Sequence, residues 1–441
     1  MERKKEPIEK IFKPLNEFLH QEASGGILLI IFTVIAFAWA NSPWSESYHH
    51  LWHTHIVVTI GNLLTFDYTI HHWINDGLMV IFFFTVGLEI KRELLVGELS
   101  SMQKASLPIA AALGGMIVPA LFYVLFNAGG EGASGWGIPM ATDIAFVVGI
   151  MALLGPRVPL TLKVFVLALA IADDIGAVMV IAIFYTSEIS MAALIVAAVV
   201  LVILAFLNKL GTKSLIPYTI LGIILWVAFL KSGVHATIAG VLLAFTIPAS
   251  ARYNTKKFSD KTRELLNKFD ETGEHGENVL TNEGRQTDVM AIEENCKKIL
   301  TPLQRFEHGL HPWVSYFIIP LFALANAGVT FTGMDFIGAI TSPVSSGIIV
   351  GLFVGKQIGI FGFSWIAVKL KFGSLPEGVN WTKIYAAGML AGIGFTMSLF
   401  IAGLAFTEET LIDLSKIGIL CGSLMSGVLG YVLLKASISK D

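Results

Sequence analysis

The feature that most constrains this chain is a pair of adjacent carboxylates, Asp173 and Asp174, in the middle of an apolar run. The run extends from Leu162 to Tyr185 and reads LKVFVLALAIADDIGAVMVIAIFY. About 20 apolar residues are enough to cross a bilayer, and a charge at the centre of such a run costs at least ~2.5 kcal/mol. Two such charges together indicate a functional site inside a membrane-spanning helix.

The composition is that of a polytopic membrane protein. Of the 441 residues, 54% are hydrophobic and only 14% are charged, against roughly 25% charged in an ordinary soluble domain. The net charge is −3 and the basic residues form only short clusters, which excludes nucleic acid as a partner. Cys296 and Cys421 lie too far apart for a C-x-x-C motif, so no disulfide framework or cysteine metal site is indicated.

The apolar runs predict an all-α fold with about twelve transmembrane helices. An even number of spans places both termini on one side of the membrane. The runs lie near residues 25–40, 71–90, 105–127, 136–153, 160–185, 190–208, 214–230, 233–248, 309–328, 345–369, 381–406 and 411–434.

Lys and Arg occupy alternate connections between these runs, which predicts that both termini are cytoplasmic. Connections 41–70, 128–135, 186–189 and 329–344 contain neither residue. The predicted segments are a cytoplasmic N-terminal segment (1–24), helices 1 to 8 (25–249), a charged cytoplasmic insertion (250–305) with helical patches near 259–269 and 286–300, helices 9 to 12 (306–435) and a cytoplasmic tail (436–441).

Two apolar runs are interrupted at corresponding places in the two halves of the chain. The segment 135–143 reads GWGIPMATD, and the segment 388–398 reads GMLAGIGFTMS. Glycine, proline and polar residues at such positions break a helix inside the membrane. Paired breaks are typical of an inverted-repeat transporter whose binding site lies at the bilayer midplane, although glycines that only serve packing are an alternative.

Consecutive side chains on a helix point about 100° apart, so Asp173 and Asp174 have different surroundings. One can face a water-filled cavity and bind a cation while the other faces a countercharge, and helical geometry leaves open which does which. At the first break, Thr142 and Asp143 offer hard oxygen ligands, which suit a small hard cation rather than a transition metal. Alternatively, these two residues only satisfy the broken backbone.

Lys356 lies near the centre of the tenth run, more than ten residues from either end. Both interfaces are then roughly 15 Å away, too far for the side chain to snorkel, so a buried acid must pair with the ammonium or it must lose its proton. A purely structural salt bridge is the alternative to a role in transport.

A third group of candidates lies at the predicted cytoplasmic end of the second and ninth runs. Glu89 begins an ion network at the end of the second run, and Glu307, His308 and His311 gather at the start of the ninth. Histidine titrates near neutral pH, so this cluster is a candidate sensor of cytoplasmic pH. Ordinary interfacial side chains are the alternative.

Several long motifs carry a resemblance, in order along the chain: NDGLMVIFFFTVGLEIKREL, ATDIAF, LALAIADDIGA, SGVHATIAGVLLAF, HPWVSYFIIPLFALANAGV and VGKQIGI. Together they resemble the NhaA family of sodium/proton antiporters over nearly the whole membrane region. The resemblance implies a twelve-helix exchanger of the bacterial inner membrane with two crossed, interrupted helices, an inverted repeat and a homodimer. It implies no cofactor and no catalytic residue, with Na+ and H+ as transported ions and Li+ as a further candidate.

The resemblance also assigns roles to individual residues. Asp174 matches the principal aspartate that carries the cation and the proton, with Asp173 as its neighbour that engages the lysine matched by Lys356. Na+ is therefore expected at Asp174 and Asp173. Thr142 and Asp143 match the polar pair that balances the helix-end charges at the crossing. Glu89, Glu307, His308 and His311 match the pH-response region, where the insertion 250–305 departs from the family's compact loop.

Exchange by alternating access follows if Na+ and H+ compete for the same carboxylates, mainly Asp174 with Asp173. Acid pH then favours the protonated site and alkaline pH the sodium-bound site. Two acids, or an acid and a lysine, allow more than one proton per sodium and hence an electrogenic cycle. The alternatives are a sodium-coupled solute symporter and an intramembrane aspartyl protease, although the chain contains no Gly-Asp pair and a protease needs two acids that share one water.

Overall fold

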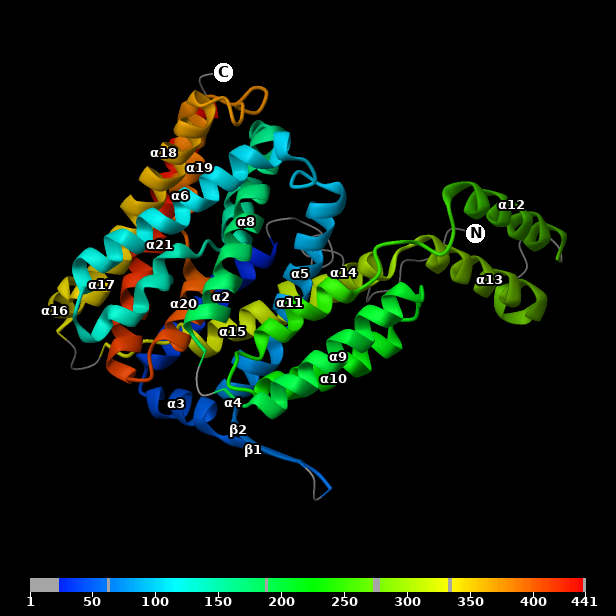
Figure 1. Ribbon diagram of the computed structural model, residues 1–441, viewed down its shortest axis with the longest axis horizontal. Helices are drawn as coiled ribbons and strands as arrows, with labels where there is room; N and C mark the ends of the chain where they lie inside the picture. The colour runs from blue at the N-terminus through cyan, green and yellow to red at the C-terminus, as the bar shows by residue number, and fades with distance from the viewer. Residues whose placement is uncertain (1–23, 62–63, 187–188, 273–277, 332–334, 439–441) are drawn as a thin grey trace.

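The computed structural model describes residues 24–61, 64–186, 189–272, 278–331 and 335–438. Within these ranges the chain is helical apart from one antiparallel β-hairpin (Figure 1). The α-helices are α2 (Ser24–Ala40), α3 (Ser45–His53), α4 (Ile70–His72), α5 (Met79–Val96), α6 (Met102–Asn127), α7 (Ile144–Leu153), α8 (Leu160–Phe184), α9 (Met191–Lys209), α10 (Ile216–Leu230), α11 (Thr237–Thr246), α12 (Thr255–Glu271), α13 (Glu283–Ile299), α14 (Pro302–Trp313), α15 (Ile319–Asn326), α16 (Phe336–Thr341), α17 (Pro343–Val350), α18 (Lys356–Lys369), α19 (Trp381–Leu390), α20 (Phe395–Ala405) and α21 (Glu409–Ile438).

Six further segments have tighter or wider turns than an α-helix. The wider, π-helical segments are η1 (Trp73–Leu78), η5 (Val314–Ile318) and η6 (Gly351–Gly355). Each of them continues into an α-helix without a break in the chain. The tighter 3₁₀ segments are η2 (Glu131–Met140), η3 (Gly155–Arg157) and η4 (Val279–Thr281).

Each apolar run predicted from the sequence coincides with a helix or with two consecutive helices of the structure. In the described part of the chain, six helices are long and apolar enough to cross a membrane, or nine if each sharply bent pair is one span. The helices α10 and α11 are apolar but shorter. The structure is therefore that of a multi-pass, helical membrane protein.

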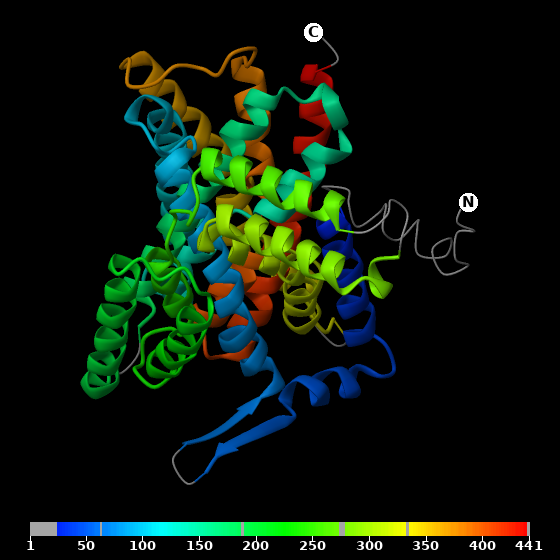
Figure 2. The ribbon, with the colours of Figure 1, turned by 90° about the vertical axis from the view of Figure 1, so that its right-hand side faces the viewer.

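The β-hairpin follows α3, which turns away from α2 by 112°. Its strands are β1 (His55–Ile60) and β2 (Leu64–Thr69), and His55 pairs with Thr69 in the register. The hairpin extends out from the helical body (Figure 2). The sequence analysis treated residues 41–70 only as a connection, because a lone two-stranded hairpin leaves a weak pattern beside the strong signal of the apolar runs.

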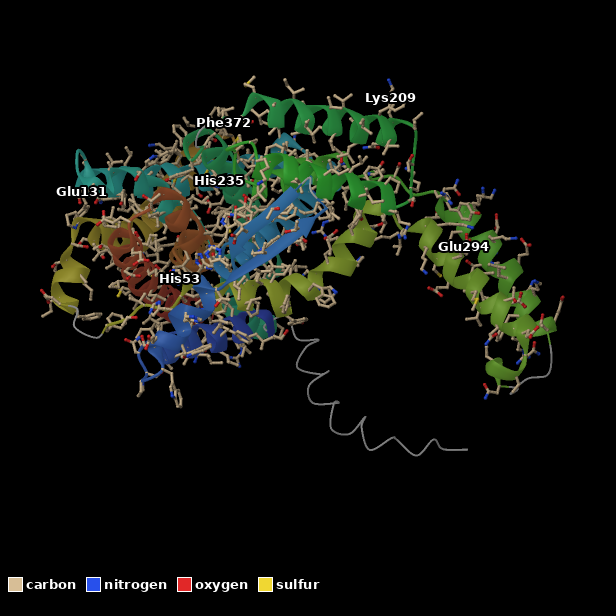
Figure 3. The ribbon with its side chains drawn as sticks, turned by 90° about the horizontal axis from the view of Figure 1, so that it is seen from below. His53, Glu131, Lys209, His235, Glu294 and Phe372 are labelled. Atoms are coloured by element: carbon tan, nitrogen blue, oxygen red, sulfur yellow. The ribbon has the colours of Figure 1, made fainter. Side chains whose placement is uncertain are left out.

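The predicted insertion 250–305 folds into two helices, α12 and α13, that project from the body, with Glu294 on the projecting part (Figures 1 and 3). Asn254 and Asn282 cap their N-termini by accepting hydrogen bonds from backbone N–H groups. Lys268 Nζ lies 2.9 Å from the Asp288 carboxylate and lowers the pKa of that carboxyl. Helix α12 covers the whole of the first predicted patch, and α13 covers the second except for its last residue, Leu300. Each helix starts before its patch.

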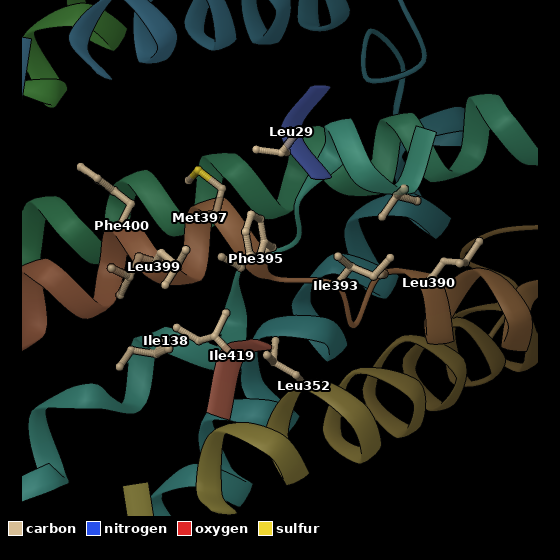
Figure 4. Close-up of a cluster of buried hydrophobic side chains, with 14 of the residues drawn as sticks. Leu29, Ile138, Leu352, Leu390, Ile393, Phe395, Met397, Leu399, Phe400 and Ile419 are labelled. Carbon is tan, nitrogen blue, oxygen red and sulfur yellow. The ribbon is translucent and has the colours of Figure 1, made fainter. Parts of the chain in front are cut away.

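The body of the protein has a continuous apolar core around the interruption of the second broken helix, at residues 391–394 (Figure 4). Leu390 contributes from the end of α19, Ile393 from the break itself, and Phe395 and Phe400 from α20. All four side chains are at most 3% exposed. Close packing in this region holds the interrupted backbone segments in place.

Glycines allow α18 to pack directly against the backbone of α6. A Cβ atom at Gly114 would overlap the carbonyl group of Gly359, and a Cβ at Gly359 would overlap the carbonyl group of Gly114. The close approach fixes the position of α18, which begins at Lys356.

We expect Gly359→Ala to lower the free energy of unfolding by about 1–3 kcal/mol, because the new methyl group meets backbone that cannot rotate away. The matched control is Gly362→Ala on the same helix, where a Cβ has no neighbour within 4 Å. This control should be neutral or stabilising by up to about 1 kcal/mol. Thermal melting of the purified protein in detergent compares the two, and equal melting temperatures would refute the close-packing argument.

Candidate ion-binding site

Asp173 and Asp174 lie in the middle of α8 and are 1% and 2% exposed. Neighbouring positions on a helix point in directions about 100° apart. Asp173 faces α18 and pairs with Lys356, whereas Asp174 lines a cavity. The two adjacent acids therefore occupy different environments.

Lys356 joins α8 to the first interrupted helix. Its Nζ atom donates hydrogen bonds of 2.8 Å to Asp173 Oδ2 and of 2.8 Å to Thr142 Oγ1, and the side chain is 0% exposed. The residue directly follows the π-helical segment η6, whose wider turn sets the direction of its side chain. The ammonium group is thus held by an ion pair and a hydroxyl inside the protein.

The two interrupted helices meet at their breaks. The segment η2 and helix α7 are bent by 41° at residues 141–143, and α19 and α20 are bent by 48° at residues 391–394. Asp143 N donates to the Ile393 carbonyl at 2.7 Å, and Thr142 Oγ1 donates to the Ala391 carbonyl at 2.9 Å. Each break therefore supplies partners for backbone groups that the other leaves without an intrahelical bond.

Asp143 caps two helix N-termini with one carboxylate. Its Oδ1 atom accepts a hydrogen bond from Phe146 N at the start of α7, at 3.2 Å. Its Oδ2 atom accepts from Thr396 N at the start of α20, at 3.0 Å, and also from the Thr396 hydroxyl. Both helix ends carry partial positive charge, so the carboxylate stabilises them together.

A cavity of about 520 Å³ reaches the Asp174 carboxylate. No hydrogen bond to Asp174 forms within the described residues, whereas the buried acids Asp143 and Asp173 are both engaged. The cavity wall also carries the exposed residue His311, so it leads from the surface to the middle of α8. Its other polar side chains are Ser24, Thr85, Glu89, Thr142, Asp143, Ser315, Tyr316 and Thr396.

The predicted pH-response residues all lie on α5 or α14, but only two of the four line the cavity. Glu89 and His311 line the cavity, on α5 and α14. Glu307 is buried and its Oε1 atom lies 2.6 Å from Arg92 Nη1, which ties α14 to α5. His308 is exposed on α14 and is not among the residues that line the cavity.

Two further residues of the site were not singled out in the sequence analysis. Thr396 donates to Asp143, and Thr85 lies on the cavity wall one helical turn before Glu89. Thr396 lies at the start of the helix after the second break, as Asp143 does at the start of the helix after the first. This correspondence is the signal that could have identified Thr396. Nothing in the apolar surroundings of Thr85 distinguishes it from a packing residue.

Apart from His311, the polar side chains that face the cavity carry oxygen atoms, which are suitable ligands for a small cation that sheds its water. The Asp174 carboxylate supplies charge, and Thr85, Thr142 and Thr396 contribute hydroxyls to the wall. Across the described ranges, no cluster of three or more His, Cys, Asp or Glu side chains could hold a resident metal. The chemistry of the wall fits a transported ion that binds and leaves.

Comparison with known proteins agrees with this chemistry. The family model described as Na+/H+ antiporter 1 matches residues 16–434. The chain is 50% identical over 428 residues to the Na(+)/H(+) antiporter NhaA of Koribacter versatilis, covering 97% of this chain and 92% of that protein. It is 49% identical over 434 residues to the NhaA of Oleidesulfovibrio alaskensis, covering 98% and 95%. With the NhaA of Wolinella succinogenes it shares 50% identity over 420 residues, covering 95% and 92%.

Lys356→Met is expected to destabilise the protein by about 3–5 kcal/mol, because it leaves the Asp173 carboxylate buried without its countercharge. The double variant Asp173→Asn, Lys356→Met removes both charges and should regain most of that loss. Melting of the wild type, both single variants and the double variant gives the coupling between the two side chains. Strictly additive losses would show that the buried pair does not stabilise the fold.

Proposed function

The chain belongs to the Na+/H+ antiporter 1 family, the NhaA antiporters, and on this premise we propose that Asp174 is the carboxylate for which Na+ and H+ compete. As a member of that family the protein is a Na+/H+ antiporter of the membrane and not an enzyme. Solute symport and peptide cleavage, the two alternatives from the sequence, are therefore set aside.

The observation that carries the proposal is the difference between three buried acids. Asp143 accepts hydrogen bonds from two helix ends, and Asp173 is paired with Lys356. Asp174 alone faces the cavity without a hydrogen bond from the described residues. A carboxylate in this position is available to whichever cation enters, and occupancy by one excludes the other.

Alternating access follows from the cost of an empty charged site. An ionised Asp174 without a bound cation is unfavourable in the membrane interior, so either a proton or Na+ has to accompany the switch between inward-open and outward-open forms. In the proposed cycle, protons enter down their gradient and drive the extrusion of sodium. The oxygens of Asp173 add to the sodium site once Lys356 releases this carboxylate.

The Asp173 and Lys356 pair provides a second titratable unit in the cycle. If one proton leaves Asp174 and another leaves this pair while a single Na+ binds, each turn moves net charge across the membrane. The exchange is then electrogenic and responds to the membrane potential. The contact between Lys356 and Asp173 at 2.8 Å supports this coupling.

The wider architecture is proposed from the same premise. Twelve transmembrane helices in two inverted repeats account for paired interrupted helices, an arrangement for which NhaA is itself a known example. We infer a homodimer in a bacterial inner membrane, with both termini and the segments 1–24, 250–305 and 436–441 cytoplasmic, and with membrane helices over 25–249 and 306–435. Residues 1–23 and 439–441 lie outside the described part of the chain.

Regulation by pH is proposed for the mouth of the cavity. Glu89 and His311 line it, and the ion pair between Glu307 and Arg92 joins the two helices that carry them. Protonation of Glu89, whose charge interacts with those of Glu307 and Arg92, would change the contact between the two helices. His308, which is exposed outside the cavity, supports the proposal least.

Asp174→Asn should abolish Na+-driven proton movement in proteoliposomes, since the amide keeps the side-chain shape but can neither bind nor release the exchanged proton. The matched control is Asp413→Asn on α21, whose acid contacts Lys416 at 3.2 Å and does not line the cavity. This control should exchange ions like the wild type. Wild-type exchange by Asp174→Asn would refute the proposal.

Competition also predicts the pH dependence of sodium affinity. Below the pH at which Asp174 releases its proton, the half-saturating Na+ concentration should rise about tenfold for each unit by which the pH falls, and more steeply where the Asp173–Lys356 pair also takes up a proton, while the rate at saturating Na+ stays high. Sodium titrations of proton flux at a series of pH values measure this. A half-saturating concentration that does not change with pH would mean that Na+ and H+ use separate sites.

A further inference from the structure

We propose that a second cavity binds the phosphate headgroup of an anionic phospholipid. This cavity lies beside the end of each interrupted helix that is remote from the break. This cavity measures about 1260 Å³ and lies at the end of α21, beside the turn after α7 and the start of α19. It is separate from the cavity that reaches Asp174, with which it shares no lining residue. The proposal concerns lipid binding and does not depend on the role given to Asp174.

The lining of this cavity is basic. Arg157, Lys383 and Lys435 all face it, and none of its described lining residues is acidic. Arg157 forms no hydrogen bond or ion pair within the described residues. Among the described residues, the Lys435 ammonium contacts only the Tyr431 ring, with its Nζ atom 5.7 Å from the ring centre. Lys383 donates to the Gly378 carbonyl at 3.0 Å and adds positive charge to the wall.

Arg157 and Lys435 have no carboxylate partner within the described part of the chain, and two such cations favour an anion that they hold together. Arg157 follows the last turn of α7, and Lys435 lies in the last turn of α21. Both therefore lie at the ends of membrane helices, the depth at which phospholipid phosphates are found. Basic pockets between helix ends are suited to anionic headgroups, whose phosphate accepts hydrogen bonds from a guanidinium and an ammonium at once.

An apolar stripe beside the cavity identifies the ligand as a lipid rather than a soluble anion. Leu424, Val428 and Val432 lie at intervals of four residues on α21 and are all exposed, so they form one face of the helix. Val432 belongs to the cavity lining, as does Leu153, which is also exposed. Acyl chains can follow this stripe while the headgroup contacts Arg157 and Lys435.

The position of the cavity gives the lipid a structural task. Its wall includes the end of α7 and the beginning of α19. These are the ends of the two interrupted helices that lie away from the breaks, which meet at Asp143. A headgroup bound there would tie these ends to α21. Binding should therefore stabilise the folded protein against heat.

The test uses the purified, full-length protein in a neutral detergent. Phosphatidylglycerol or cardiolipin should raise the melting temperature of the wild type, and phosphatidylcholine at the same concentration should not. Each near-surface cation contributes roughly a fivefold preference for anionic lipid, so Arg157→Gln with Lys435→Gln should weaken the apparent lipid affinity roughly twenty-five-fold. Native mass spectrometry of retained lipid provides the second measurement.

The matched control is Lys369→Gln. Lys369, like Lys435, lies in the last turn of a membrane helix and above an aromatic ring four residues earlier, but it is outside the cavity. This variant should keep the wild-type response to anionic lipid. Melting in phosphatidylcholine alone verifies that each variant is folded.

Two results would overturn the proposal. One is a double variant that is folded and is stabilised by anionic lipid as strongly as the wild type. The other is inorganic phosphate that raises the melting temperature of the wild type as much as the lipid does, which would assign the cavity to a soluble anion. Retention of anionic lipid by the wild type and by Lys369→Gln, with loss in the double variant, supports the lipid site.

Discussion

The structure depends on the mutual satisfaction of two broken backbones inside a membrane. A lipid bilayer offers no water to unpaired N–H and carbonyl groups, so a helix can stop there only where protein groups replace its missing hydrogen bonds. Groups in the breaks at residues 141–143 and 391–394 supply hydrogen bonds to each other's backbone. Asp143 caps the two helices that begin after the breaks. The irregular backbone then places polar groups beside α8 without exposing them to lipid.

This arrangement leaves the three buried acids in three different environments. Asp143 is occupied by helix ends, and Asp173 and Lys356 hold each other, so the costly charges of the membrane interior are largely compensated. Asp174 is left for the cavity because it lies one position further along the helix. Two identical side chains acquire different surroundings because successive residues of a helix point about 100° apart.

Much of this could be predicted from the sequence because apolar runs and interior charges are strong signals. The helices, both breaks and the helical patches of the 250–305 insertion follow from hydropathy and from glycine and proline. The partners were harder to predict. That Asp143 reaches Thr396, 253 residues away, depends on how the two breaks cross, and the β-hairpin at 55–69 has too few residues to stand out. The contact between Asp173 and Lys356 was expected from family resemblance, since helical periodicity leaves the choice between the two aspartates open.

The direction of the Lys356 side chain depends on the number of residues in the π-helical segment Gly351–Gly355, which directly precedes it. A π turn accommodates one more residue than an α turn, so everything after it is rotated by about 100° relative to an uninterrupted helix. Deleting one residue there would keep the composition and length of the span almost unchanged and yet turn the ammonium away from α8. An insertion or deletion in this turn therefore redirects Lys356, whereas a substitution keeps the number of residues that sets this direction.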